Sequence, residues 1–275
     1  MIDEYHIRAK AGKEKIDAGI IEKDYILSKT IMALTVIKTF QDFFIFKGGT
    51  AIKKCYYTEW RFSEDLDFSS KKQLNRKEIR FLFQETIDNA MKMFGLSMRI
   101  LEYSQYPRES DKPVSAQLKL GYDGPLRKSS GQKNNIKIDI SYDEKIYSDK
   151  NIMPVFKIYE DDIETRIPVY TLEEIIAEKL RSILQRGKSR DYYDVWKLLK
   201  NHSVDFDKKL ANDIMKKKCG DKNIGVPKRE DFFLAQRIDE AAQYWKRGLA
   251  HQIVNLPDFN ETRKELDKLL NEFLD

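Results

Sequence analysis

The sequence predicts an α+β fold in which a small mixed sheet comes first and a helical bundle follows. Short apolar or alternating stretches, such as residues 43–46 and 136–142, are typical of strands in the first part. Beyond Pro168, almost all of the apolar residues follow the spacing of α-helices. We therefore expect one mixed domain over residues 1–165 and a C-terminal helical bundle domain over residues 166–275.

The composition excludes several classes of protein. The chain has 275 residues, of which 41% are hydrophobic and 35% charged, and its net charge is +5. It is too apolar for a disordered chain, and no stretch approaches the roughly 18 apolar residues of a membrane-spanning helix. We expect no secretory signal, because the first ten residues lack an apolar segment. Two cysteines and three histidines, all well separated, favour a cytoplasmic protein without disulfides or a Cys or His metal centre.

Local patterns predict the elements in order. Gly, Pro and Ser residues indicate a loop at residues 121–131. In chain order we expect helices over residues 19–40 and 76–94, a helical stretch from about 50 to 57, and strands over 43–46, 66–69, 96–103, 116–122 and 136–142.

A strand that leads into two glycines is the first candidate feature. Gly48 and Gly49 follow residues 43–46, and Thr50 then begins a predicted helix. Glycine lets the backbone approach a ligand without a Cβ in the way, and free N–H groups at a helix start can bind phosphate. Taken alone, two glycines after a strand are more often a simple tight turn.

Two carboxylates lie two residues apart in the next predicted strand. Asp65 and Asp67 should point to one face, while Leu66 and Phe68 point into the core. Carboxylates about 7 Å apart repel each other unless a cation compensates them, and Mg²⁺ prefers such oxygen ligands. An isolated pair of this kind is also typical of an exposed strand surface.

A third carboxylate, Asp139, occupies the polar face of the strand predicted at 136–142. By itself it suits a solvent-facing position. In combination, three carboxylates and a glycine turn supply what two-metal nucleotidyl transfer requires, with one Mg²⁺ holding a nucleoside triphosphate (NTP) and a second activating the attacking hydroxyl. We therefore expect Asp65, Asp67 and Asp139 to be metal ligands and catalytic residues, with the first two converging beside the Gly48–Gly49 turn.

A lysine lies within the apolar stripe of a later helix. Thr171 and Glu174 form a capping-box pattern that predicts the start of this helix. On a helical wheel Lys179 falls inside the apolar arc, whereas Glu174, Glu178 and Arg181 fall outside it. Because a buried ammonium is costly without a partner, Lys179 either contacts a ligand or extends its charge to the surface.

Several cations precede a further carboxylate, Asp191. Gly187 should end the first helix of the bundle, and Ser189 can cap the next one. Arg190 and its neighbouring cations suit a triphosphate or an RNA backbone, although cations are also common at a helix C-terminus. Asp191 can equally pair with such a cation instead of taking part in chemistry.

Two basic stretches also stand out. Residues 119–137 contain five basic residues and one acid, and residues 208–229 contain eight basic residues and two acids. Each can bind RNA phosphates or form a solvated surface.

The chain resembles the AbiEii-type nucleotidyltransferase toxins, the family that includes the MenT toxins, within the polymerase-β-like superfamily. The most specific feature is the order of Gly48-Gly49-Thr50 and a later Ser-x-Asp-Leu-Asp pattern. The matching stretches span about residues 20–200 and are Ile21-Glu22-Lys23-Asp24-Tyr25, Phe46-Lys47-Gly48-Gly49-Thr50, Arg61-Phe62-Ser63-Glu64-Asp65-Leu66-Asp67-Phe68, Glu178-Lys179-Leu180 and Arg190-Asp191-Tyr192-Tyr193-Asp194.

The resemblance implies a nucleotidyltransferase-like first domain and a role for individual residues. It assigns Gly48, Gly49, Thr50 and Ser63 to the triphosphate, Asp65 and Asp67 to the metals, Lys179 to nucleotide phosphate, and Asp191 to a late essential carboxylate. Asp139 rests only on the superfamily's third-strand carboxylate. Either Asp139 or Asp191 therefore supplies the third catalytic carboxylate.

The resemblance further implies an activity and partners. We expect Mg²⁺-dependent transfer of NMP from an NTP to a hydroxyl, at the tRNA 3′ end, with release of pyrophosphate. The protein would be the toxin of a toxin–antitoxin or phage-defence system, neutralised by a separately encoded antitoxin. Two alternatives are a catalytically inactive NTP- or RNA-binding module and a metal-dependent nuclease, and the presence of every metal-binding residue and of the glycine turn disfavours them.

Overall fold

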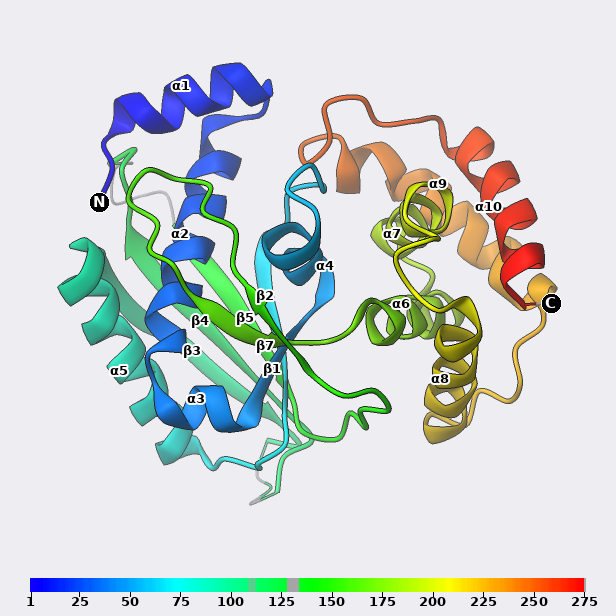
Figure 1. The fold of residues 1–275 in the computed structure, drawn as a ribbon, viewed down its shortest axis with the longest axis horizontal. Helices are drawn as coiled ribbons and strands as arrows, with labels where there is room; N and C mark the ends of the chain where they lie inside the picture. The colour runs from blue at the N-terminus through cyan, green and yellow to red at the C-terminus, as the bar shows by residue number, and fades with distance from the viewer. Residues whose placement is uncertain (109, 111, 128–133, 275) are drawn as a thin grey trace. The chain divides into compact units, whose positions relative to one another are not determined.

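The chain folds as two compact units (Figure 1). The computed structural model describes residues 1–108, 110, 112–127 and 134–274. Unit 1 comprises Met1–Glu144 and Lys150–Val169, and unit 2 comprises Lys145–Asp149 and Tyr170–Asp275. A mixed sheet with helices makes up unit 1 and helices make up most of unit 2, which confirms the predicted α+β fold.

Unit 1 is built on one seven-stranded mixed sheet with the order β3-β4-β5-β2-β1-β7-β6. β2 runs parallel to β5 and β1 runs parallel to β7, whereas the other neighbours are antiparallel. The elements of the unit are α1 (Glu4–Glu14), α2 (Ala18–Thr35), α3 (Lys38–Phe43), β1 (Phe44–Lys47), α4 (Gly48–Ala51), the π-helix η1 (Ile52–Tyr56), β2 (Asp65–Ser70), α5 (Arg76–Phe94), β3 (Ser97–Tyr106), β4 (Ser115–Asp123), β5 (Asn135–Ser141), β6 (Asn151–Pro154) and β7 (Arg166–Val169).

The two faces of this sheet differ in chemistry. α2 and α5 pack together over one face (Figure 1). In β5 the side chains of Ile136, Ile138 and Ile140 are buried, while those of the residues between them are half-exposed. The alternation that the sequence predicts for this strand is therefore confirmed, and it leaves a polar face on which functional carboxylates can stand.

A buried ion pair fixes the turn of helix that follows β1. The Lys54 ammonium of η1 lies 2.7 Å from the Asp24 carboxylate of α2, and both side chains are almost completely buried. Burial alone would raise the pKa of Asp24, but Lys54 and Lys53 outweigh it and hold this pKa below its usual value. The charge pair therefore anchors η1, and with it the start of α4, to the core.

Two of the predicted helices differ from the structure. The helix expected over residues 19–40 is two helices, because Ile37 adopts an extended backbone between α2 and α3. This residue ends a run of three β-branched side chains, which have low helix propensity, and Gln41 donates a 2.9 Å hydrogen bond to the Thr35 carbonyl at the end of α2. The helical stretch expected up to residue 57 changes from α to π geometry in η1.

The strands β6 and β7 were not predicted, and β4 continues through Asp123 into the expected loop. Residues 124–127 of that loop have neither helix nor strand, and residues 128–131 lie outside the described residues. The same holds for residues 128–133 of the first basic stretch.

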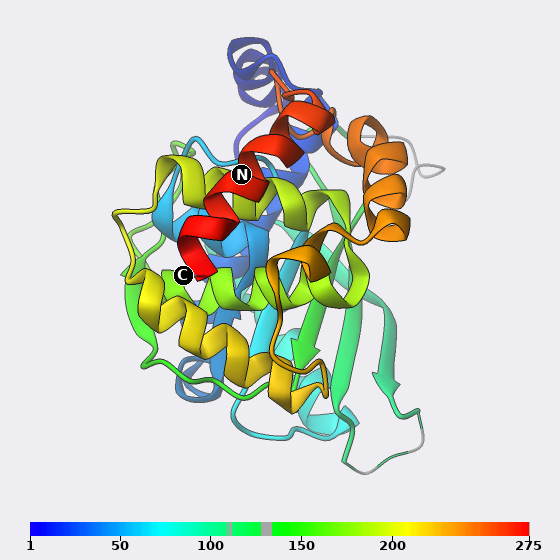
Figure 2. The same ribbon diagram turned by 90° about the vertical axis from the view of Figure 1, so that its right-hand side faces the viewer.

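Unit 2 is a bundle of helices (Figure 2). α7 packs against α6, α9 and α10, and α6 also packs against α8. The elements are α6 (Leu172–Arg186), α7 (Ser189–Asn201), α8 (Lys208–Asp221), the 3₁₀ helix η2 (Arg229–Phe233), α9 (Ala235–Leu249) and α10 (Phe259–Leu274).

A buried glutamate organises the start of this bundle. Thr171 caps α6 by accepting a hydrogen bond from the Glu174 N–H, but the Glu174 carboxylate does not complete the predicted capping box. It lies 2.8 Å from the Lys218 ammonium and accepts hydrogen bonds from the N–H groups of Tyr147 and Ser148. Glu174 therefore holds the segment Lys145–Asp149 in unit 2.

Candidate active site

The glycine turn lies directly beside a predicted metal ligand. All four residues of β1 are buried, and Gly48 follows them with a φ of +81°, a conformation that side chains disfavour. A Cβ on Gly48 would lie 2.4 Å from Oδ2 of Asp67. The pairing of β1 with β2, which sets Lys47 opposite Asp67, creates this approach. Glycine is thus required at position 48 by both its backbone and its neighbour.

The two aspartates of β2 share one face of the strand. Leu66 and Phe68 are completely buried, whereas Asp65 and Asp67 are half-exposed. The Thr50 hydroxyl donates a 2.5 Å hydrogen bond to the backbone carbonyl of Asp65. This contact joins the first turn after the glycines to the start of the strand, so the predicted triphosphate residue Thr50 is engaged with the protein backbone.

Asp139 stands in the same row of the sheet as Asp67. The parallel pairing of β2 and β5 sets the two residues opposite each other, so their side chains point to the same face about 5 Å apart along the sheet. The Asp139 carboxylate pairs with Lys137 at 2.8 Å and accepts a hydrogen bond from Gln117 at 2.9 Å. Both carboxylate oxygens therefore face protein partners.

The donor set of this face suits a hard cation, because Asp65 and Asp67 offer carboxylate oxygens from one strand. Within the described ranges, no group of three or more His, Cys, Asp or Glu side chains is arranged to hold a metal ion. A physical reason is that Lys137 and Gln117 turn the Asp139 carboxylate toward themselves. Asp65 and Asp67 offer the carboxylate oxygens that Mg²⁺ prefers, and Asp139 is engaged with Lys137 and Gln117.

Ser63 belongs to an irregular segment, residues 57–64, that connects η1 to β2. Its side chain is half-buried. The neighbouring Glu64 forms a 2.7 Å ion pair with Lys23 of α2. The segment is thus held between α2 and the strand that carries the aspartates.

The predicted site residues of unit 2 form a separate charge cluster. The Lys179 ammonium lies 3.4 Å from Asp191 and 3.0 Å from Asp194, and Arg186 contacts Asp191 at 3.0 Å. Both aspartates are completely buried, and the Lys179 side chain is 11% exposed. Burial alone would raise the pKa of Asp191, but Lys179 and Arg186 outweigh it and hold the pKa below its usual value.

Lys179 has protein partners within this cluster. Its ammonium pairs with two carboxylates of α7. Glu174 and Arg181, expected outside the apolar arc, are buried as well, since α8 covers a second side of α6. The prediction that Ser189 caps α7 was wrong: Lys188 is the N-cap, and the Ser189 hydroxyl donates to the Ala241 carbonyl.

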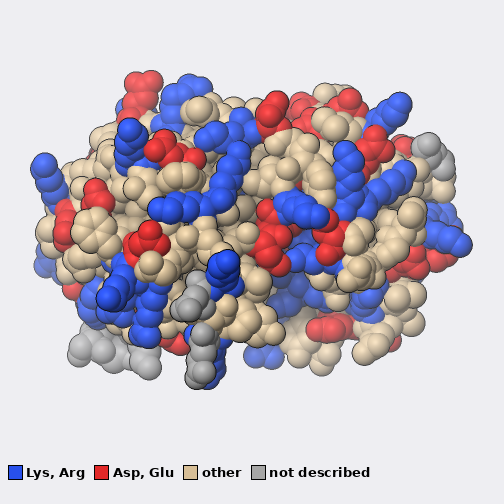
Figure 3. Space-filling model, turned by 90° about the horizontal axis from the view of Figure 1, so that it is seen from below, with Lys and Arg blue, Asp and Glu red and all other residues tan. Residues whose placement is uncertain are grey.

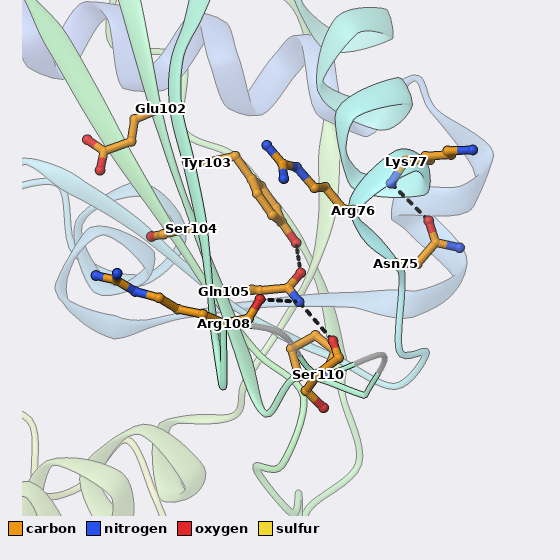
Figure 4. Close-up of a pocket in the computed structure, with 10 residues that line it drawn as sticks. Asn75, Arg76, Lys77, Glu102, Tyr103, Ser104, Gln105, Arg108 and Ser110 are labelled. Carbon is orange, nitrogen blue, oxygen red and sulfur yellow. Dashed lines mark hydrogen bonds between the residues drawn. The ribbon is translucent and has the colours of Figure 1, made fainter.

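Arg190 lines a cavity of about 390 Å³ in unit 2. Lys188, Ser189 and Tyr244 contribute to the same lining, and the Arg190 side chain is half-exposed. A second cavity, of about 700 Å³, lies in unit 1 between the start of α5 and the end of β3 (Figure 4). In that cavity Arg76 lies over the Tyr103 ring, and none of its described lining residues is a predicted site residue.

The exposure of the basic residues varies within the second basic stretch. Basic and acidic side chains are interspersed over the face in Figure 3. Within the second stretch, Lys218 is buried against Glu174, while Lys216 and Lys217 are exposed.

Sequence reasoning assigned no role to Arg61 or Lys47, which lie next to the site. A Cβ on Gly49 would lie 2.7 Å from Nη2 of Arg61. Lys47 is buried and lies 3.7 Å from the Glu144 carboxylate. The Arg61-Phe62-Ser63 stretch was visible as a motif, but only the folded chain brings its first residue to the glycine turn.

The sheet carries a glycine turn at the end of β1 and alternating carboxylates on the neighbouring β2. The model of the family described as "Nucleotidyl transferase AbiEii toxin, Type IV TA system" matches residues 31–272. The chain therefore belongs to the AbiEii family of nucleotidyltransferase toxins, which confirms the resemblance seen in the sequence. It is a nucleotidyltransferase whose family implies a nucleotide substrate and an antitoxin.

One solved structure shows the same fold. The nucleotidyltransferase toxin MenT4 of Mycobacterium tuberculosis aligns with a TM-score of 0.68 and 15% identity, over 100% of this chain and 90% of that one. An antigenic nucleotidyltransferase-like protein of Paracoccidioides brasiliensis aligns at 12% identity over 78% of this chain and 97% of its own, with a TM-score of only 0.33. No curated protein matches the chain. In the part of the chain that the structure describes, no helix is long and apolar enough to cross a membrane.

Proposed function

We propose that the protein transfers NMP from an NTP to the 3′ hydroxyl of tRNA, with release of pyrophosphate, and that Mg²⁺ is required. The observation that carries this proposal is the approach of Gly48 to the Asp67 carboxylate. It brings a turn suited to phosphate and a carboxylate suited to a divalent cation to one point, where nucleotidyl transfer needs both.

The site residues of unit 1 have different roles in this proposal. Backbone N–H groups of Gly48 and Gly49 bind the triphosphate, and Ser63 adds a hydroxyl contact. Thr50 acts through its hydrogen bond to Asp65, which fixes the start of β2 against the turn. Asp65 and Asp67 hold Mg²⁺, which when bound offsets phosphate charge and lowers the pKa of the attacking hydroxyl.

We assign the role of the third carboxylate to Asp139 rather than to Asp191. Asp139 shares a row with Asp67, whereas Asp191 is completely buried and neutralised by Lys179 and Arg186. Once released from Lys137, Asp139 would accept the proton of the attacking hydroxyl and would join Asp65 and Asp67 as a residue that holds the metal.

Lys179 and Arg190 remain proposed contacts to nucleotide phosphate. Arg190 suits the role better, because its half-exposed side chain borders a cavity, whereas the Lys179 ammonium already pairs with two carboxylates. We also propose residues 1–165 as the nucleotidyltransferase domain and residues 166–275 as a C-terminal helical bundle domain. As a toxin that acts on tRNA, the protein would work in the cytoplasm and be neutralised by a separately encoded antitoxin.

The proposal is tested by incubating the protein with total RNA, Mg²⁺ and each NTP in turn, and then sequencing RNA 3′ ends. We expect one or more nucleotides added to tRNA 3′ ends by the wild type and none by Asp65→Ala. Asp123→Asn is the matched control, because Asp123 is an exposed carboxylate of β4 paired only weakly with Arg99 at 3.4 Å.

Three outcomes would contradict the proposal. Nucleotide addition to RNAs other than tRNA would show that the acceptor is another RNA. NTP binding without incorporation would favour an inactive binding module, and RNA cleavage in Mg²⁺ without NTP would favour a nuclease.

A further inference from the structure

Arg61 is a buried arginine in the irregular segment that leads to the aspartates. The segment, residues 57–64, has neither helix nor strand, and it carries Ser63 and ends at Asp65. Arg61 is only 5% exposed. A guanidinium this deeply buried has little surface to offer a ligand, so its effect must pass through the protein groups that it touches.

The Arg61 guanidinium contacts both halves of the candidate site. Its Nη2 lies where a side chain on Gly49 would have to be, 2.7 Å from the position of the missing Cβ. Its Nη1 donates a 3.1 Å hydrogen bond to the carbonyl of Phe62, the residue before Ser63. One planar group therefore spans from the phosphate turn to the segment that presents the predicted triphosphate and metal residues.

Other contacts fix the parts that Arg61 joins. The buried Lys53 ammonium donates to the carbonyls of Thr58 and Trp60, at 3.0 and 2.9 Å, and lies 4.0 Å from the centre of the Phe62 ring. This cation ties the outer half of the segment to η1. Arg61 is the cation whose contacts reach the glycine turn itself.

We propose that Arg61 is a positioning residue that sets the spacing between the Gly48–Gly49 turn and the Asp65–Asp67 pair. The proposal rests on the function proposed above. If phosphate binds at the turn and Mg²⁺ at the aspartates, this spacing decides whether the α-phosphorus is in line for attack, and a displacement of about 1 Å costs roughly 100-fold in rate. Lysine cannot replace arginine here, because only the planar fork reaches both contacts.

The test uses two variants that disturb the contact from opposite sides. Arg61→Lys keeps the positive charge but removes the planar guanidinium group. Gly49→Ala keeps the arginine but adds a methyl group where Nη2 lies, and the flexible end of Arg61 can move aside without unfolding. We expect each variant to lower kcat by about 10- to 100-fold. Binding of a non-hydrolysable NTP analogue, measured by calorimetry, should change by less than about threefold.

The double variant sharpens the test. Lysine leaves room for the alanine methyl group, so Gly49→Ala combined with Arg61→Lys should lose about as much kcat as one single variant rather than the product of both. Thr58→Ala is the control, since Thr58 is an exposed residue of the same segment whose hydroxyl bonds only to Glu59 within the described part of the chain, and its backbone carbonyl, which Lys53 contacts, is retained. We expect it to keep kcat within about twofold.

Three results would overturn the proposal: unchanged kcat in both single variants, multiplicative losses in the double variant, or a tenfold loss of analogue binding at unchanged kcat. The last result would make Arg61 a direct phosphate contact. Absence of NTP-dependent transfer by the wild type would instead refute the proposed function, so the two failures are distinguishable.

Discussion

The predicted site aspartates lie in both units, and the fold treats those of unit 1 and Asp191 of unit 2 in opposite ways. In unit 1, Asp65 and Asp67 stand half-exposed on a strand beside a glycine turn. In unit 2, Asp191 and Asp194 are completely buried and held by Lys179. Aspartates therefore stand on a face that can bind a ligand in unit 1. In unit 2 they belong to a buried network of ion pairs. The comparison predicts that the first cluster governs activity and the second governs stability.

The largest expected effect is on activity in unit 1. We expect Asp67→Asn to lower nucleotide transfer by at least about 1,000-fold, because removing a metal-stabilised contact in a transition state costs several kcal/mol. Since Asp67 is half-exposed, the midpoint of thermal unfolding of the variant should differ from that of the wild type by only a few degrees. Labelled-NTP incorporation and a thermal melt measure the two quantities. Loss of folding together with activity would contradict a catalytic role.

The second expected effect is on stability in unit 2. Lys179→Met leaves two buried carboxylates without their shared cation, which should lower the free energy of unfolding by about 3–5 kcal/mol. Because the folded-state pKa of Asp191 is lowered, its contribution to stability is present above its unfolded pKa and is lost as the pH falls. Denaturant unfolding at several pH values measures both. A variant that stays fully stable but inactive would show instead that Lys179 acts on a ligand.

A substitution at the turn should combine both kinds of effect. Gly48→Ala forces a side chain into a positive φ and against the Asp67 carboxylate. We expect about 1–2 kcal/mol of destabilisation and roughly a 100-fold loss of transfer. Gly12→Ala is a suitable control, because a Cβ there meets no atom within 4 Å. Equal transfer activity of the two variants would show that the glycine turn is not part of the active site.

Lys53 gives the smallest expected effect per pH unit. Burial lowers the pKa of this ammonium from 10.5 to about 8, with a further contribution from Lys54, although Asp24 raises it. Between pH 8 and 10.5 the unfolded chain binds the proton that the folded chain has lost, so stability rises with pH in this window. The difference in unfolding free energy between wild type and Lys53→Met should rise by up to about 1.4 kcal/mol per pH unit. A pH-independent difference would contradict the shifted pKa.

Much of the fold follows from local patterns. The period-2 alternation of residues 136–142 and the helical period of residues 76–94 predict β5 and α5, because both periods are set within a few residues. β6 and β7 escape such reasoning, since each has four residues and contains a proline, and distant pairing alone makes them strands.

Some features of the candidate site follow from local patterns, and others depend on contacts between distant segments. Alternation alone predicts that Asp65 and Asp67 share a face. The position of Asp139 opposite Asp67, and of Arg61 against Gly49, depends on pairing between distant segments that no local pattern contains. The burial of Glu174 depends likewise on α8, which a helical wheel of α6 does not include.

The most direct test of the central claim, that the glycine turn and Asp67 form one site for NTP and Mg²⁺, is calorimetric binding of a non-hydrolysable NTP analogue with and without Mg²⁺. We predict that Mg²⁺ tightens binding at least tenfold in the wild type and has no effect in Asp67→Asn. Binding that is independent of Mg²⁺ in the wild type, or that keeps its Mg²⁺ dependence in the variant, would contradict the claim.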